Sequence, residues 1–201
     1  MFERYSEPAR RVLFFARYEL TALGGTTIEP LHVLLGLLRE RAGVTGRILA
    51  QWNVQVPELR RQLQGGAESG PKVPASVEVP FAASAKRVLN FAAQEADQLR
   101  NPTIEPEHIL LALLRENDPI AAASLTAYGM TLDAARERTA AAMHEPPPPQ
   151  PERDPAEAAV HMDRIAVLSR ALAKAQPGST EARNLVDAID GELMTLRELL
   201  R

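Results

Sequence analysis

The chain repeats a long stretch of its own sequence. The segment IEPLHVLLGLLRE, from Ile28 to Glu40, returns without a gap as IEPEHILLALLRE from Ile104 to Glu116, a shift of 76 positions. The same shift aligns Arg11-Val-Leu with the second Arg-Val-Leu, which begins at Arg87. A tandem duplication of fixed period is typical of two copies of one supersecondary unit that pack together. The chain should therefore fold as two similar halves.

Composition and apolar spacing favour an all-α fold. Only 4% of the 201 residues are aromatic, whereas strands are enriched in aromatic and β-branched residues. Within each copy, apolar residues recur every three or four positions, which is the helical period. Ser6 can cap the first helix, Gly24 can end it, and Pro30 fits the first turn of the next helix. The first expected helix is capped by Ser6 and ends at Leu23, the second opens at Pro30, and the last opens at Thr131. The helices between them are expected to span Val44 to Trp52, Pro57 to Leu63, Ser84 to Leu99, Pro106 to Glu116 and Pro119 to Tyr128.

These helices predict the organisation of the first 143 residues. We expect two tandem four-helix repeats, about 1–63 and 81–142, which together form one eight-helix domain over residues 1–143. Residues 64–80 between them are rich in Gly and Pro, a composition typical of a linker that crosses the surface.

The rest of the chain has a different pattern. Residues 144–155 are rich in Pro and are predicted to form a stiff, extended linker. Residues 156–201 carry two helical runs with a narrow apolar seam, broken at Pro177-Gly178, which predicts a helical hairpin. That seam can close on itself, pair with a second copy to form a homodimer, or dock on another protein, and the sequence does not choose among these.

Charge and apolar run length bear on partners and localisation. The formal net charge is −3, which gives no global attraction to nucleic acid or to an anionic membrane. No segment approaches the roughly 20 apolar residues of a membrane span, and charges interrupt the amino terminus where a secretory signal would be apolar. The absence of Cys excludes disulfides and thiolate chemistry. We therefore expect a cytoplasmic protein that binds neither nucleic acid nor membranes.

The polar residues do not form a catalytic constellation. His32 and His108 recur at the same place in each copy, but neither has a second ligand at metal-binding spacing, so a structural role in which the imidazole bonds to a neighbouring helix end is favoured. The string from Gly65 to Lys72 resembles a phosphate-binding loop only loosely, because Pro71 occupies the position of the essential lysine. The hypothesis is a protein that is not an enzyme and that needs no cofactor or metal.

The doubled motif resembles the Clp amino-terminal (Clp R) domain family, and so does the opening MFERYSEPARRVL. The resemblance covers about residues 1–143 and implies two four-helix repeats. In that family these repeats form the substrate- and adaptor-binding head of ClpA, ClpB and ClpC type AAA+ unfoldases. Because a phosphate-binding loop is missing from these 201 residues, the resemblance implies the head without its ATPase modules.

The family also implies candidate binding residues. In ClpC-type heads, a hydroxyl residue at the start of each repeat and a Glu just before the motif His form acidic sites for phosphoarginine. This sequence keeps the hydroxyl as Ser6 but has Leu31 at the first Glu position, and it keeps Glu107 but has Ala82 at the second hydroxyl position. Each predicted site is therefore half present, and the candidate protein-binding residues are Ser6, Leu31 and Glu107. Simple capping of helix starts is the competing interpretation for the carboxylates Glu29, Glu105 and Glu107.

Two functional hypotheses follow from the resemblance. The first is a protein-binding module that recognises segments of unfolded substrates or adaptors, with Leu31 and the aromatic residues Phe2, Tyr5 and Trp52 as possible contributors to an apolar groove. For each of these aromatic residues, a place in the core is the favoured interpretation. The second is a regulator that binds or competes with a full-length Clp ATPase without handling substrates.

Overall fold

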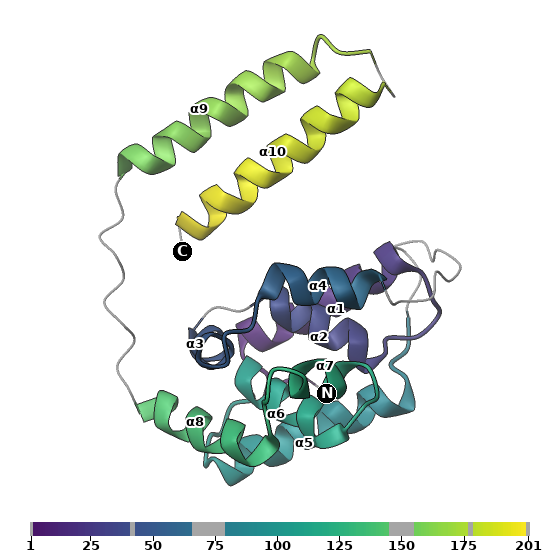
Figure 1. The fold of residues 1–201 in the computed structure, drawn as a ribbon, viewed down its shortest axis with the longest axis vertical. Coiled ribbons are helices and arrows are strands. Elements are labelled where there is room, and N and C mark those ends of the chain that lie inside the picture. The colour runs from purple at the N-terminus through teal and green to yellow at the C-terminus, as the bar shows by residue number, and fades with distance from the viewer. Residues whose placement is uncertain (1, 41–42, 66–78, 145–154, 177–178, 200–201) are drawn as a thin grey trace. The chain divides into compact units, whose positions relative to one another are not determined.

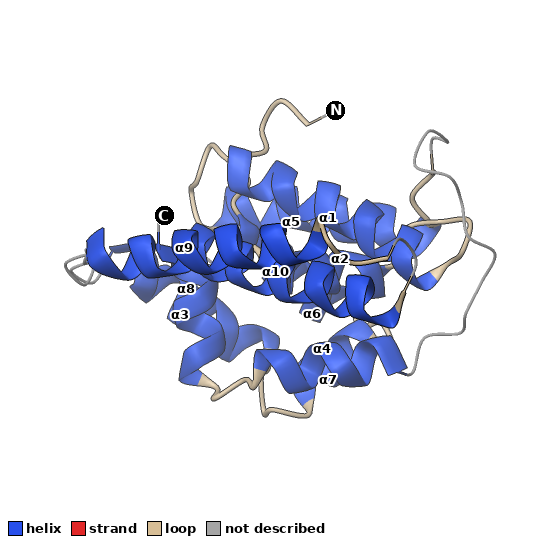
Figure 2. Cartoon of the chain, turned by 90° about the horizontal axis from the view of Figure 1, so that it is seen from above, coloured by secondary structure: helices blue, strands red, loops and turns tan. Residues whose placement is uncertain are grey.

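The computed structural model describes residues 2–40, 43–65, 79–144, 155–176 and 179–199 (Figure 1). The chain divides into two units, Met1–Pro146 and Pro147–Arg201. Helices account for all the regular structure in the described ranges, apart from two isolated bridges, as the colouring of Figure 2 shows. The predicted all-α class is confirmed.

The first unit contains the two four-helix repeats. The helices of the first repeat are α1 (Glu7–Leu23), α2 (Pro30–Arg39), α3 (Gly43–Gln51) and α4 (Val56–Gly65). Those of the second are α5 (Ala83–Gln98), α6 (Pro106–Glu116), α7 (Ala121–Thr126) and α8 (Leu132–His144). Only α7 begins more than one residue away from its predicted start. It begins after Asp118, whose Oδ1 accepts the backbone N–H groups of Ile120 and Ala121 at 3.0 and 2.8 Å.

The two repeats begin with different caps. Ser6 is the N-cap of α1, and its hydroxyl accepts the backbone N–H of Ala9 at 3.2 Å. At the corresponding place before α5, Ala82 has no side chain that can accept such a bond. The first turn of α5 therefore lacks a partner that α1 has.

We expect Ala82→Ser to stabilise the domain by about 1 kcal/mol, because a hydroxyl N-cap satisfies one amide of the first turn. Ser6→Ala should lower stability by a similar amount. The measurement is urea unfolding of both variants beside the parent chain. Equal midpoints for all three would show that the cap at Ser6 contributes nothing.

Helices α2 and α6 form the centre of the domain. Every residue from Pro30 to Leu38 is buried, and so is every residue from Pro106 to Leu114. Helix α1 packs along α2, and α5 packs along α6, so each repeat contributes one long pair. The first pair approaches closely at Gly36, where an added Cβ would lie 2.4 Å from the Val12 carbonyl oxygen. The second pair has the fully buried Ala112 at that position.

The segment that precedes each repeat pairs with the other repeat. Tyr5 forms a parallel bridge with Ile104, and Ile28 forms one with Phe81. The backbone N–H of Ser6 donates to the Ile104 carbonyl at 3.0 Å, and the N–H of Ala82 donates to the Ile28 carbonyl at 3.0 Å. These bonds repeat with the same shift of 76, so the exchange is reciprocal and joins the halves into one body.

A buried carboxylate anchors each repeat. Glu19 on α1 is 1% exposed and accepts the Arg60 guanidinium at 2.7 Å. Its counterpart Glu95 on α5 is fully buried and accepts Arg136 at 2.7 Å and Arg115 at 3.1 Å. Burial opposes ionisation of Glu95, but hydrogen bonds from both arginines outweigh it and lower the pKa of Glu95. These ion pairs tie the first helix of each repeat to the helices that follow.

The second unit is a helical hairpin of α9 (Pro155–Leu172) and α10 (Thr180–Leu199). The two helices pack on each other, with Leu196 buried in the seam and an ion pair between His161 and Glu192. The seam thus closes within the hairpin, although other apolar side chains stay exposed. These are Val160, Met162, Val167, Val186 and Leu193. Pairing of this hairpin with a second copy stays a prediction.

Parts of the predicted linkers fall outside the described residues. This applies to 66–78, which includes most of the Gly65–Lys72 string, to 145–154 and to Pro177-Gly178. Where the structure does describe the edges of the Pro-rich segment, His144 ends α8 and Pro155 begins α9. Among the described helices, none combines the length and apolarity required to cross a membrane.

Candidate functional site

A cavity of about 430 Å³ lies where the amino-terminal segment meets α5. It exists because that segment crosses to the second repeat and bridges to Ile104. The cavity therefore combines residues that are far apart in the sequence. Its lining consists of Phe2, Glu3, Arg4, Tyr5, Lys86, Leu89, Asn90, Ala93 and Ile104.

Aromatic packing fixes the amino-terminal wall of the cavity. Tyr5 is 5% exposed, and its hydroxyl donates to the Leu89 carbonyl at 3.2 Å. Burial raises the pKa of Tyr5 to about 12, so the phenol stays protonated and keeps donating. Phe2 stands edge-on to Tyr5, with 5.3 Å between ring centroids, and lies 6.4 Å from Phe81. This wall is thus preformed and apolar.

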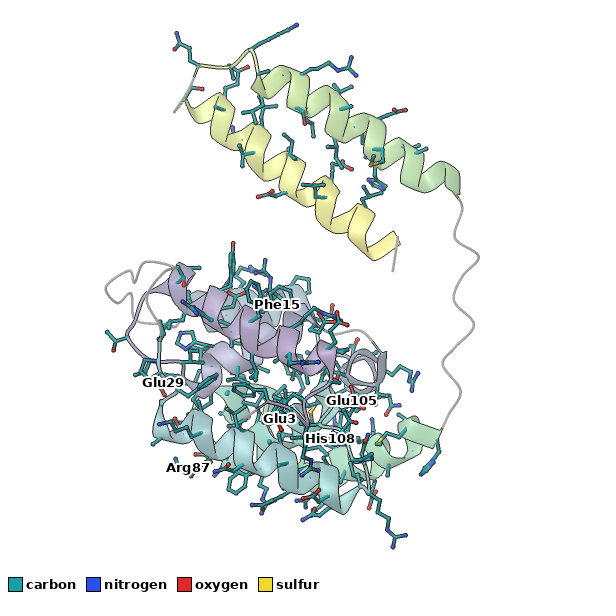
Figure 3. The ribbon with its side chains drawn as sticks, turned by 180° about the vertical axis from the view of Figure 1, so that it is seen from behind. Glu3, Phe15, Glu29, Arg87, Glu105 and His108 are labelled. Atoms are coloured by element: carbon teal, nitrogen blue, oxygen red, sulfur yellow. The ribbon has the colours of Figure 1, made fainter. Side chains whose placement is uncertain are left out.

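Polar groups surround the apolar wall. Glu3, Arg4, Lys86 and Asn90 line the cavity and are all exposed, and Figure 3 labels Glu3 on the amino-terminal segment. Arg4 is held by Asp97 at 2.6 Å and by the Pro102 carbonyl at 3.3 Å. A volume in the range of ligand pockets, with apolar walls and a few polar groups at the edge, suits the side chains of a peptide.

The first repeat differs at the corresponding face. The shift of 76 places Phe14 of α1 where α5 has Asn90, and Arg17 where α5 has Ala93. Asn90 and Ala93, which are smaller than Phe14 and Arg17, both line the cavity. Lys86, Asn90 and Ala93 were not predicted as site residues, although an alignment of the two copies shows the differences at Asn90 and Ala93.

The three aromatic residues considered from the sequence separate into two places. Phe2 and Tyr5 line the cavity. Trp52 lies elsewhere, where its indole N–H donates to the Gly129 carbonyl at 3.2 Å and the Arg138 guanidinium stacks 3.9 Å from its ring. Trp52 thus joins the first repeat to the second.

The backbone pairing between the repeats determines where the predicted binding residues lie. Ser6 lies beside Ile104, which leads into α6 and Glu107, whereas Ala82 lies beside Ile28, which leads into α2 and Leu31. The hydroxyl and the carboxylate that the sequence assigned to different half-sites therefore belong to the same junction. Leu31 is 8% exposed and contributes to the core, so it does not by itself form an exposed apolar surface.

Glu107 is buried under the first repeat. It is 6% exposed, and one carboxylate oxygen lies 3.5 Å from the Thr45 hydroxyl of α3. Arg47 of α3 is also nearby, and its guanidinium donates to the Ala142 carbonyl of α8 at 2.6 Å. Burial raises the pKa of Glu107 to about 7. Glu107 is therefore not presented as an exposed, fully ionised acceptor.

The repeated histidines hold the starts of their own helices. The backbone N–H of Glu29 donates to His32 Nδ1 at 3.0 Å, and that of Glu105 donates to His108 Nδ1 at 2.9 Å. Burial lowers the pKa of His32 and lowers that of His108 to about 4, so both rings accept as neutral imidazoles. The structural interpretation is confirmed, with the difference that each ring caps its own helix and not a neighbouring one.

The carboxylates before these histidines also act at helix starts. Glu29 and Glu105, both labelled in Figure 3, are the N-cap residues of α2 and α6 and form capping boxes with the histidines. Glu29 in addition accepts the hydroxyls of Thr27 and Ser84 at 2.9 and 3.2 Å, which ties it to α5. The capping interpretation is confirmed for both. In the described part of the chain, no three His, Asp or Glu residues gather as a metal site.

Sequence comparison identifies relatives of this arrangement. A family model for the Clp repeat (R) N-terminal domain matches residues 4–101 and 80–182. The chloroplastic chaperone protein ClpC1 of Oryza sativa subsp. japonica is 36% identical over 129 residues, which is 64% of this chain and 14% of ClpC1. An ATP-dependent Clp protease ATP-binding subunit ClpA homolog of Guillardia theta is 36% identical over 139 residues, which is 69% of this chain and 17% of that protein. The chain thus spans less than a fifth of the length of these relatives.

Solved structures show the same fold. The N-terminal domain of the caseinolytic protease associated chaperone ClpD from Arabidopsis thaliana matches with a TM-score of 0.56 at 24% identity, over 72% of this chain and 97% of that domain. The doubled motif, the two four-helix repeats and the family model agree. The chain belongs to the Clp repeat (R) N-terminal domain family.

Proposed function

We propose that this chain is a protein-binding module of the Clp proteostasis system that recognises segments of substrates or adaptors. The observation that carries the proposal is the preformed cavity between the amino-terminal segment and α5. Membership of a family whose members head Clp ATPases supports the same conclusion.

The cavity offers the contacts that a peptide segment requires. An apolar side chain of the segment packs against Phe2 and Leu89, where it leaves water. The Asn90 amide can donate to and accept from the peptide backbone, and Lys86 with Arg4 can pair with a carboxylate. This function is binding without a chemical step, since none of these side chains forms a nucleophile and base pair.

Filling the cavity tests the proposal. We expect Ala93→Trp to weaken binding by at least about tenfold, because the indole takes the volume that an apolar side chain of the ligand would occupy. The assay is binding of reduced, carboxymethylated casein, a permanently unfolded protein, to the 201-residue chain. Quantitative affinity capture from cell lysate, with the same variants as baits, shows which natural partners depend on the cavity.

The matched control is Ala141→Trp, which places the same indole on an exposed position of α8 outside the cavity lining. It should bind as the parent chain does, and thermal unfolding should show that both variants fold. Equal binding by Ala93→Trp and the parent would refute the cavity as the site. Capture of a Clp ATPase by the parent chain, without any binding of unfolded casein, would favour the regulator over the substrate-binding module.

A further inference from the structure

The hairpin of α9 and α10 is small for a unit that folds alone. Its helices have 18 and 20 residues, and Leu196 is the one buried side chain among those that the structure describes in it. Units of this size usually require a disulfide, a metal or a partner chain in addition to their own core. The chain has no Cys, so no disulfide closes the hairpin. Association with another chain would supply the burial that the hairpin lacks.

The seam between α9 and α10 determines which side chains point outward. His161 of α9 contacts Glu192 of α10, and the two helices run in opposite directions (Figure 1). The other partly or fully buried residues of the seam are Ile165, Leu168 and Leu172 of α9 and Leu185, Ile189 and Leu196 of α10. A residue that precedes or follows a seam residue by one position is turned away from the seam by about 100°.

One side of the hairpin gathers large apolar side chains from both helices. Met162 follows a seam residue of α9 by one position, and Val186 and Leu193 each follow a seam residue of α10 by one position. Because the helices are antiparallel, this equal rotation turns all three side chains to the same side. They are 57%, 43% and 46% exposed. Val160 and Val167 instead precede seam residues of α9, so they lie on the opposite side.

Small residues accompany the large ones on the first side. Ala159 and Ala166 of α9 lie there seven positions apart, both exposed, together with Ser169. The histidine–glutamate contact sets the level of one helix against the other. Within one residue, Leu193 is therefore level with Ala159, and Val186 is level with Ala166. We name the surface made by Ala159, Met162, Ala166, Ser169, Val186 and Leu193 the pairing face.

Charge does not prevent burial of the pairing face. Among the described side chains of α9, the charged residues Asp163, Arg164 and Arg170 are turned away from it by helical rotation. On α10, Asp190 lies between the two large residues along the helix, but it is turned about 50° further from the seam. Its carboxylate therefore lies at the border of the face, where it keeps contact with water.

The size of the pairing face suits a weak dimer. Helix α9 has 18 residues and is about 27 Å long, and two packed helices are about 20 Å wide. The face therefore measures about 500 Å², and two copies in contact bury about 1,000 Å² in total, the lower limit for a specific interface.

We propose that the pairing face joins the hairpins of two copies of this chain into a four-helix bundle, with α9 of one copy against α10 of the other. A two-fold axis along the hairpins keeps the levels of the residues, so Val186 and Leu193 of each copy pack beside the alanines of its partner. The face complements itself because it carries large side chains on one helix and small ones at the same level on the other. A second copy is thus favoured over an unrelated protein.

This pairing is independent of peptide binding. The cavity beside α5 belongs to the first unit and the pairing face to the second. A measurement of association without any peptide therefore tests the pairing alone, and failure of either proposal leaves the other standing.

Sedimentation equilibrium of the 201-residue chain, from about 1 to about 500 µM, tests the pairing. We expect a monomer–dimer equilibrium with a micromolar dissociation constant, as the small interface implies. Leu193→Asp should weaken it by at least about a hundredfold, because the new carboxylate would be buried without a partner. The matched control Val167→Asp introduces the same charge on the opposite side and should leave the dissociation constant within about twofold of the parent.

The absence of Cys permits a second measurement, which reports the arrangement of the helices. Ala166→Cys and Val186→Cys are prepared as separate chains, mixed while reduced and then oxidised. A disulfide between the two different chains is expected, because α9 of one copy lies against α10 of the other at these levels. Each variant alone should form much less cross-linked dimer, because its two cysteines lie on helices that are not adjacent in the bundle.

Three results would overturn the inference. A parent chain that stays monomeric over the whole concentration range would show that no second copy covers the face. Loss of the dimer in Val167→Asp but not in Leu193→Asp would assign the pairing to the opposite side of the hairpin. Cross-linking of either cysteine variant alone as efficiently as the mixture would place like helices side by side and refute the pairing of α9 with α10.

Discussion

Gly36→Ala should destabilise the domain by about 3 kcal/mol, because the added methyl group collides with backbone and not with a side chain that can rotate. The new Cβ would lie 2.4 Å from the Val12 carbonyl oxygen and 2.7 Å from the Ala16 nitrogen. Both atoms belong to α1, so the whole helix must move away from α2, its main packing partner. Intrinsic helix propensity acts in the opposite direction and favours Ala by about 1 kcal/mol. A measured loss of stability would therefore show that the backbone collision outweighs helix propensity, and a gain would show the opposite.

The second repeat provides the control for this substitution. Ala112→Gly makes the reverse exchange at the corresponding position of α6, where Ala112 is fully buried. Loss of helix propensity and of one buried methyl group should lower stability there by about 1 to 2 kcal/mol. Urea unfolding of both variants gives the comparison. Unchanged or increased stability of Gly36→Ala would mean that α1 and α2 are not held as closely as the structure shows.

Local signals explain why the helices could be predicted. Ser6 before α1, Gly24 after it and Pro30 in the first turn of α2 each act within a few residues, so they can be read without knowledge of the fold. The start of α7 was misplaced because Pro119 and Asp118 both signal a helix start. The Asp118 carboxylate binds the amides of residues 120 and 121, so regular helix begins at Ala121.

Long-range pairing explains what the sequence could not reveal. The bridge from Tyr5 to Ile104 joins residues about a hundred positions apart, and no local pattern encodes that partnership. The cavity depends on this bridge, so its lining could not be assembled from the sequence. The same exchange places Ser6 near the junction that leads to Glu107. Part of the site could nevertheless have been predicted, because an alignment of the two copies places Asn90 at the position of Phe14.

The burial of Glu107 also depends on distant residues. From the sequence, a carboxylate in the first turn of a helix is an exposed cap or a binding group. In the structure, Thr45 and Arg47 of the first repeat cover it, and the Ala142 carbonyl of α8 binds the Arg47 guanidinium. This environment gives Glu107 an unusual titration, which leads to a second large effect.

We expect Glu107→Gln to stabilise the domain at pH 8 and to have little effect below about pH 4.5. Burial raises the pKa of Glu107 to about 7 from an ordinary value of 4.5. The folded state therefore disfavours the ionised form. Glu107 does not reduce the stability of the domain below pH 4.5, where its carboxyl is protonated, but stability is lost as the pH rises towards 7. By linkage, a shift of this size corresponds to a loss of about 3 kcal/mol above pH 7. The amide has no charge to bury and should avoid that loss.

The difference between variant and parent isolates Glu107 from other titrating groups. Burial lowers the pKa of His108 to about 4. The contribution of its neutral ring to the stability of the folded state is therefore fully present above pH 6.5 and is lost as the pH falls. That trend opposes the trend of Glu107 over the same pH range, and the parent's own profile shows only their sum. Since both proteins contain His108, subtraction removes it. The advantage of Glu107→Gln should rise between pH 4.5 and 7 and then stay constant.

Two further variants make this result specific to the buried position. Glu107→Leu copies Leu31, the residue that the first repeat uses at the same place, and its stability relative to the parent should likewise rise between pH 4.5 and 7. Glu137→Gln removes an exposed carboxylate of α8 and is the control for the loss of one surface charge. A difference between Glu107→Gln and the parent that does not change with pH would mean that water reaches the Glu107 carboxylate and that α3 does not seal it. A rising difference would identify Glu107 as a charge that the junction between the repeats must bury at neutral pH.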